Sequence, residues 1–268
     1  MRILALVSVF LVLALPLRAA TEAEIHRLFD KFQLREQFRD LSLDPSELPD
    51  GVEGTLLEEP WRTAVARHGD MSDFVDLLAK EYAQRVTEED LARLHEIADT
   101  QLSQEITRAS VAVSRMDRAE MLDEGLALMA RYTEDDPARL AALRAMDRAA
   151  GVSERMMVIA MNIGVAMMTG AMAAADNPID LSEAEIRELV ETQSWLVRVE
   201  VNRALYASFA LAYRDFSVEE IEQVTAWNNE PAMQQFNKVC FDVIEREFTI
   251  RMRAVGQDLV DAVSKPRL

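Results

Sequence analysis

The chain has 268 residues, of which 50% are hydrophobic and 6% aromatic, with only 8 glycines and 8 prolines. This composition allows a substantial core but disfavours the many turns of an all-β fold, so it predicts an all-α protein. The formal net charge of −18 argues against nucleic acid as a partner, because phosphate recognition relies on clustered Lys and Arg side chains.

Residues 1–20 have the pattern of a secretory signal peptide. Arg2 precedes the uncharged stretch Ile3–Leu15, and the small residues Ala19 and Ala20 follow it. The apolar stretch is shorter than the roughly 20 residues that a membrane-spanning helix needs. We therefore expect export to the periplasm, with an uncleaved membrane anchor as the alternative.

Four pairs of residues have the capping-box pattern, in which a Ser or Thr is followed three residues later by an acid. The pairs are Thr21 with Glu24, Thr87 with Asp90, Ser182 with Glu185, and Ser217 with Glu220. Each is followed by apolar residues at helical spacing, so each predicts the start of a helix. The box at Asp90 is the weakest, because aspartate is shorter than glutamate.

The four predicted helix starts form two similar pairs, which suggests an internal duplication. The sequence around Thr21 recurs around Ser182 at an offset of 161 residues, and that around Thr87 recurs around Ser217 at an offset of 130. The difference between the two offsets predicts an insertion in the first copy. The segment 44–60 is rich in Pro and Gly, as expected of such an insertion. The expected organisation is a signal peptide at 1–20, a first helical copy at 21–115 with an insertion near 44–73, central helices at 116–178, and a second copy at 179–268.

The segment 156–175 carries no charged residue and is rich in Met and Ala. It meets the length criterion for a membrane span, but a helix that is apolar all round can also be the centre of a helical bundle. We expect a multi-helix bundle in which the two copies surround this helix as a buried core. A membrane span is the alternative.

The segment 216–236 combines a helix start, paired acids, an aromatic residue and a proline. The residues are Ser217, Glu219, Glu220, Ile221, Trp227 and Pro231. This pattern resembles the C-terminal motif of an exported bacterial family, domain of unknown function 2059. Asn228, Glu230 and Met233 depart from the family pattern, which has a second aromatic residue, a hydroxyl residue and a glycine there. The resemblance implies a helical periplasmic domain, here in two degenerate copies, and it supplies no catalytic residues.

Residue types that bind metals are scattered along the chain. His26, His68 and His95 lack the spacings of zinc or di-iron sites. Four methionines share one face of the apolar segment, where a copper(I) site is the alternative to ordinary core packing. They are Met157, Met161, Met168 and Met172. We expect no metal and no other cofactor.

Catalytic motifs are also lacking in the sequence. It contains no Gly-x-Ser-x-Gly, no Ser-x-x-Lys and no phosphate-binding loop. Its paired acids mostly fall at predicted helix starts, and Cys240, the single cysteine, lies in an apolar setting where a buried thiol is expected. We therefore expect a protein that is not an enzyme, with an acid/base hydrolase as a minor alternative.

Side chains that commonly anchor interfaces are concentrated in the second copy. They are Trp195, Arg198, Arg203, Tyr206, Tyr213 and Trp227. These residues form either a recognition surface or part of the core. The leading hypothesis is an exported, non-catalytic helical protein that binds another protein or an envelope component. The alternative is a carrier of an apolar small molecule in a Met-rich helical pocket. A membrane is expected as a partner only if the signal peptide stays uncleaved or 156–175 spans a bilayer.

Overall fold

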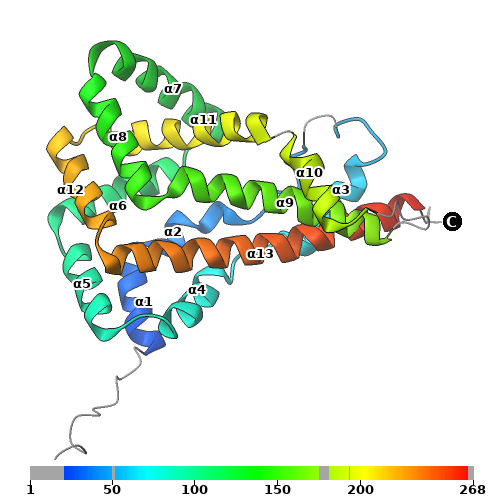
Figure 1. Cartoon of the computed structure of the whole chain (residues 1–268), viewed down its shortest axis with the longest axis horizontal. Helices are drawn as coiled ribbons and strands as arrows, with labels where there is room; N and C mark the ends of the chain where they lie inside the picture. The colour runs from blue at the N-terminus through cyan, green and yellow to red at the C-terminus, as the bar shows by residue number, and fades with distance from the viewer. Residues whose placement is uncertain (1–20, 50–51, 175–180, 193, 265–268) are drawn as a thin grey trace, which may run out of the picture.

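The expected all-α fold is confirmed by a computed structural model that describes residues 21–49, 52–174, 181–192 and 194–264. These residues form thirteen α-helices and one short 3-10 helix, and they contain no strand (Figure 1). The predicted signal peptide at 1–20 lies outside the described residues.

The helices of the first half are α1 (Glu22–Lys31), α2 (Leu34–Gln37), the 3-10 helix η1 (Arg39–Leu41), α3 (Glu58–His68), α4 (Phe74–Ala83), α5 (Glu88–Ala98), α6 (Gln101–Ser114) and α7 (Arg118–Asp135). Those of the second half are α8 (Pro137–Ala150), α9 (Val152–Ala174), α10 (Glu183–Glu191), α11 (Ser194–Ala212), α12 (Val218–Asn228) and α13 (Pro231–Ser264).

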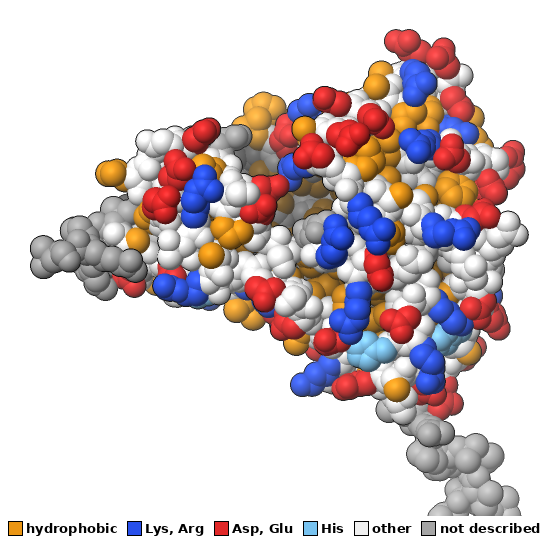
Figure 2. Space-filling view, turned by 180° about the vertical axis from the view of Figure 1, so that it is seen from behind, with side chains coloured by type: hydrophobic (Ala, Val, Ile, Leu, Met, Phe, Trp, Pro, Cys, Tyr) orange, Lys and Arg blue, Asp and Glu red, His pale blue; other side chains and the backbone are white. Residues whose placement is uncertain are grey.

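The molecule is broad at one end and narrow at the other (Figure 1). Helices α5, α7, α8 and α12 lie at the broad end, and α3, α10 and the C-terminal ends of α9 and α13 lie at the narrow end. Seen from behind, side chains of both charges cover much of the broad end, and hydrophobic side chains show between them (Figure 2).

The predicted helix starts are all present. Full capping boxes form at Thr21, Ser182 and Ser217, where the hydroxyl accepts a backbone N–H and the glutamate accepts the N–H of the cap residue. At Thr87 only the first of these bonds forms, from the backbone N–H of Asp90 at 3.0 Å. The Asp90 carboxylate accepts the Thr87 hydroxyl at 2.8 Å instead, because its shorter side chain does not reach back to the backbone.

Helices α9 and α13 form the most extensive helix pair and run side by side in the same direction (Figure 1). Two glycines allow their backbones to approach closely. A Cβ atom on Gly170 would lie 2.0 Å from the carbonyl oxygen of Arg253, and one on Gly256 would lie 2.1 Å from that of Met167. Larger residues do not fit at either position without moving a helix.

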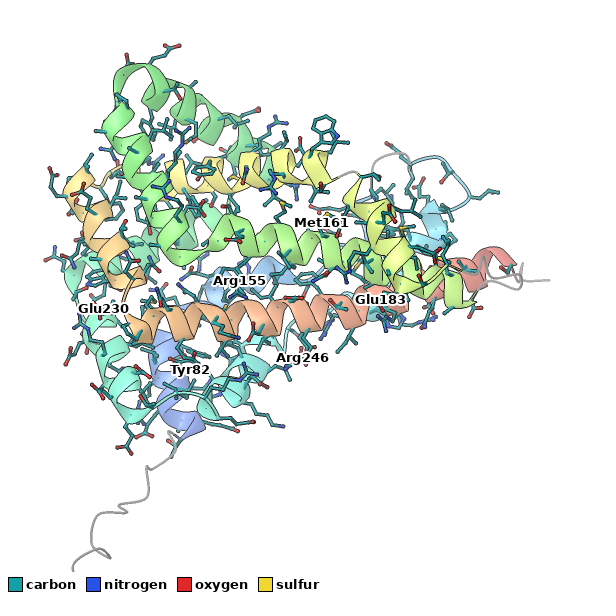
Figure 3. All side chains as sticks on the ribbon, in the orientation of Figure 1. Tyr82, Arg155, Met161, Glu183, Glu230 and Arg246 are labelled. Carbon is teal, nitrogen blue, oxygen red and sulfur yellow. The ribbon has the colours of Figure 1, made fainter. Side chains whose placement is uncertain are left out.

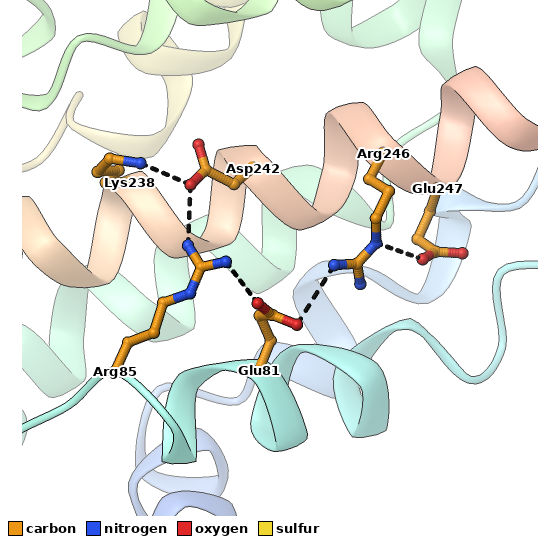
Figure 4. Close-up of polar contacts among 6 residues, drawn as sticks. All are labelled: Glu81, Arg85, Lys238, Asp242, Arg246 and Glu247. Atoms are coloured by element: carbon orange, nitrogen blue, oxygen red, sulfur yellow. Dashed lines mark hydrogen bonds and ion pairs between the residues drawn. The ribbon is translucent and has the colours of Figure 1, made fainter.

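Helix α4 is attached to α13 by an apolar cluster and a row of ion pairs. Tyr82, labelled in Figure 3, packs against Phe29 and Phe236, with ring centroids 6.2 and 5.5 Å away. Positive and negative side chains alternate along this row, which runs between α13 and the C-terminal end of α4, with Arg85 just after α4 (Figure 4). The ion pairs join Lys238 to Asp242, Asp242 to Arg85, Arg85 to Glu81, Glu81 to Arg246, and Arg246 to Glu247.

Two arginines connect helices at the broad end. The guanidinium of Arg93 in α5 donates to both carboxylate oxygens of Glu230, at 2.7 and 2.9 Å, just before α13 begins. Arg139 in α8 donates to the carbonyl oxygens of Tyr213 and Phe216, which follow the end of α11. Arg139 therefore satisfies carbonyls that have no partner within a helix.

The helix bounds repeat at the predicted offset, but the packing does not. Helix α5 at 88–98 corresponds to α12 at 218–228, and α6 and α13 begin at 101 and 231. However, α1 packs against α4 and α5, whereas α10 packs against α9. The internal duplication therefore stays a prediction.

Helix α9 is more exposed than predicted. Its side chains Ile159, Val165 and Ala166 are buried, but only 28% of its most apolar stretch is buried, and Val158 is 44% exposed. Helices α3 and α4 of the first copy pack mainly on α13, and only a few α9 side chains, among them Ile163 and Met167, join the apolar cluster of Ala64 and Val65. The two copies therefore cover α9 only in part. Among the described residues, α9 is the one helix long and apolar enough to cross a membrane, yet its close contact with α13 also accounts for its small, uncharged residues.

Candidate functional site

A cavity of about 590 Å³ lies between the helices of the broad half of the molecule. Its wall is built from α2, η1, α5, α6, α8, α9, α11, α12 and α13, and most of its surface is apolar. The largest apolar side chains on the wall are Phe32, Phe38, Phe209, Trp227, Phe236, Phe241 and Phe248. The volume falls in the range of ligand-binding pockets, about 300–1,000 Å³.

The cavity is lined by the first halves of α9 and α13, whereas their glycine contact lies further along both helices. On α13 the lining residues follow helical spacing and include Met233, Asn237, Cys240, Ile244 and Phe248. On α9 the corresponding face includes residues 152, 156, 159 and 163. Residues three or four positions apart, all apolar except Asn237, therefore form one continuous face on each helix.

Asp147 of α8 is the one charged residue among those that line the cavity, and it is only 3% exposed. Its carboxylate accepts the backbone N–H of Ser153 at 2.9 Å, the Ser153 hydroxyl at 2.6 Å and the Tyr206 hydroxyl at 2.9 Å. These three bonds satisfy the buried charge and connect α8, α9 and α11. Burial, followed by the hydrogen bond to Asp147, raises the pKa of Tyr206 to about 12.

A second cleft of about 690 Å³ shares Asp147 with the cavity. Its wall is more polar and includes Arg148, Glu154, Arg198 and Asn202. Asp147 and its hydrogen-bond partners therefore lie where an apolar interior meets a cleft with charged walls.

The structure separates the six side chains predicted as a recognition surface. Tyr213 and Trp227 are buried and line the cavity, so they do not contribute to an exposed surface. Tyr206 is half-buried and holds Asp147. Arg198 lines the second cleft.

The other two predicted residues remain at the surface on α11. Trp195 is 63% exposed, and Arg203 is exposed and lies 3.9 Å from Glu200. The helical repeat separates the four residues of α11, because it points positions 195, 198, 203 and 206 in different directions around the helix. Tyr213 lies beyond the end of α11, and Trp227 is on α12.

The methionines are also divided between different environments. Met157 and Met161 line a separate cleft with Arg187 and Glu191 of α10, and Met161 is labelled on α9 in Figure 3. The methionines of the main cavity are instead Met146, Met156 and Met233. Asp147 was not predicted as a site residue from the sequence, and neither were Ser103, Thr107 and Ser110 of α6, which also line the cavity. The spacing of four and then three residues between these hydroxyl side chains was the available signal.

Groups that carry out chemistry are not gathered at the cavity. Burial raises the pKa of Cys240 to about 12, so its thiol stays protonated and weakly nucleophilic at neutral pH. Within the described ranges, no group of three or more His, Cys, Asp or Glu side chains is placed to hold a metal ion. The volume of the cavity and its largely apolar wall suit an apolar molecule.

Comparison with protein-family models, with curated proteins and with solved structures found no match to this chain.

Proposed function

We propose that this protein binds an apolar small molecule in the cavity between α6, α9, α11 and α13. The observation that carries the proposal is the 590 Å³ cavity with its largely apolar wall. Protein interiors are close-packed, with few voids larger than a water molecule. Water that fills a large apolar space finds few hydrogen-bond partners on the wall and therefore stabilises it little. An apolar ligand would restore the contacts that the wall residues lack.

The proposed setting is the periplasm, which rests on the signal-peptide pattern of residues 1–20. An exported protein with such a cavity would act as a carrier, because it would shield an apolar molecule from water. The buried thiol and the fully hydrogen-bonded Asp147 support binding without catalysis.

The experiment is a titration of the purified protein with the neutral fluorescent probe N-phenyl-naphthylamine, whose emission rises in apolar surroundings. We expect saturable binding with one site per chain. Ala160 lies on the cavity wall, so Ala160→Trp should fill part of the space and weaken probe binding by at least about tenfold, the equivalent of about 1.4 kcal/mol.

The matched control is Ala173→Trp. Ala173 lies on the same helix but is exposed and does not line the cavity. Probe binding that is absent, or that both tryptophan variants weaken equally, would overturn the proposal. Native mass spectrometry of the gently purified protein gives a second test, since a retained ligand adds mass that is lost on denaturation.

The second candidate function is binding of a protein or envelope component, and exposed apolar side chains near the start of α11 favour it. Trp195, Leu196 and Val199 are 63%, 48% and 51% exposed, and Leu189 of the neighbouring α10 is 47% exposed. Exposed apolar clusters on a charged surface are typical of interaction sites. Chemical crosslinking in envelope extracts tests this function: Trp195→Ser should abolish a specific crosslink and leave probe binding unchanged.

A further inference from the structure

Three hydroxyl side chains form a polar stripe on the largely apolar wall of the cavity. Ser103, Thr107 and Ser110 lie on one face of α6, and all three line the cavity. Ser103 and Thr107 are only 6% and 5% exposed. Among the described residues, none of the three hydroxyls has a hydrogen-bond partner within the protein. None of these three hydroxyls is among the fully enclosed side-chain atoms that lack a partner in the described residues, which are the Tyr82 hydroxyl and Nδ1 of His95. The stripe is therefore accessible from the cavity and has unused donors and acceptors.

A fourth unpartnered hydroxyl belongs to Tyr213, just beyond the end of α11. Tyr213 lines the same cavity and is 9% exposed. Its backbone carbonyl accepts from Arg139, but within the described part of the chain its hydroxyl has no partner. Burial raises the pKa of Tyr213 above its usual range, so the group remains a hydrogen-bond donor at neutral pH.

The cavity wall offers no positive charge to a ligand. Its lining residues, which are all among the described ones, include no Lys, Arg or His. An ionised carboxylate or phosphate inside the cavity would lose its hydration without gaining a counter-charge, which is costly. The carboxylate of Asp147 would repel such an anion, and its existing three hydrogen bonds leave little capacity for a cation.

We propose that the ligand is an uncharged amphipathic molecule, an apolar body that carries a hydroxyl or ester oxygen, and that the α6 hydroxyl stripe and Tyr213 bind this oxygen. This inference rests on the proposed ligand-binding function and specifies its ligand class.

The test is displacement of N-phenyl-naphthylamine by two molecules of equal chain length, dodecanol and dodecanoate, at about pH 8, where the carboxylate is ionised. Dodecanol should displace the probe at a concentration at least about tenfold lower, in line with one or two net hydrogen bonds and an unfavourable buried charge. Tyr213→Phe removes a single hydroxyl without changing the ring and should weaken dodecanol binding severalfold, with probe binding unchanged.

The combined variant Ser103→Ala, Thr107→Val and Ser110→Ala removes the whole stripe. It should reduce dodecanol affinity by about tenfold or more, while Ser114→Ala, on the same helix but outside the cavity wall, should leave it unchanged. If the combined variant fails to fold, Tyr213→Phe and the comparison of dodecanol with dodecanoate still test the proposed ligand class. Dodecanoate that binds as well as dodecanol would overturn the ligand class alone. Failure of the probe itself to bind would overturn the proposed function and the class with it.

Discussion

The contact between α9 and α13 makes a sharp prediction about Gly170. In Gly170→Ala the new Cβ atom would lie 2.0 Å from the carbonyl oxygen of Arg253, well inside the 3.0 Å below which such contacts essentially never occur. The obstructing atom belongs to the backbone of a packed helix, so α13 must shift as a whole. Overpacking of this kind costs up to about 3 kcal/mol, and the better helix propensity of alanine returns about 1 kcal/mol. The free energy of unfolding should therefore fall by about 2 kcal/mol, which lowers the Tm by roughly 4–8 °C.

Gly164 on the same helix provides the matched control. A Cβ atom there would lie 3.4 Å from Cγ1 of Val190, an ordinary contact with a side chain. Gly164→Ala should therefore leave the free energy of unfolding unchanged or raise it by up to about 1 kcal/mol. Circular dichroism during urea and thermal unfolding compares the two variants. Free energies of unfolding that agree within about 0.5 kcal/mol would refute the close packing of α9 on α13.

Three further predictions concern the ends and connections of helices. Arg139→Met should lower the free energy of unfolding by about 2 kcal/mol, because two carbonyl oxygens after α11 lose a charged donor. Urea unfolding measures this loss, which should be smaller in Arg139→Lys. Ser217→Ala should lower the free energy of unfolding by about 1 kcal/mol, because the capping box is lost. Thermal unfolding measures this loss, and Ser217→Asp should retain most of the stability. The hydrogen bonds from Arg93 hold the pKa of Glu230 below its usual range, so this pair stabilises the protein at neutral pH and its contribution is lost as the pH falls through the folded-state pKa. Glu230→Gln should therefore lower the free energy of unfolding by up to about 1 kcal/mol at neutral pH. In urea titrations, the difference in this free energy between the variant and the unaltered protein should shrink below about pH 4. A difference that stays the same there would contradict the ion pair.

Local features of the chain were predictable because they depend on neighbours in sequence. A capping hydroxyl bonds to a backbone group only three residues away, so the starts at Thr21, Ser182 and Ser217 follow from the sequence alone. The all-α class follows in the same way from composition and apolar spacing. The partial box at Asp90 shows the same locality, since the length of one side chain decides it.

The sequence also identified Tyr213 and Trp227 as notable side chains, but their environment depended on the tertiary structure. Both line the cavity, whereas Trp195 on α11 is exposed. Which face of a helix is covered depends on the helices that pack against it, and those lie far away in the sequence. For the same reason, α9 was expected to be enclosed, although the first-copy helices pack on α13.

The sequence by itself therefore determined where these helices begin, that they dominate the fold, and that the chain is acidic with an apolar central segment. Only the tertiary structure decided that the first halves of α9 and α13 line a cavity with α6, and that Asp147 and the α6 hydroxyls face the same space. The physical reason is that capping and helical periodicity act over a few residues, whereas a cavity is the space left where helices distant in sequence do not fill the volume between them.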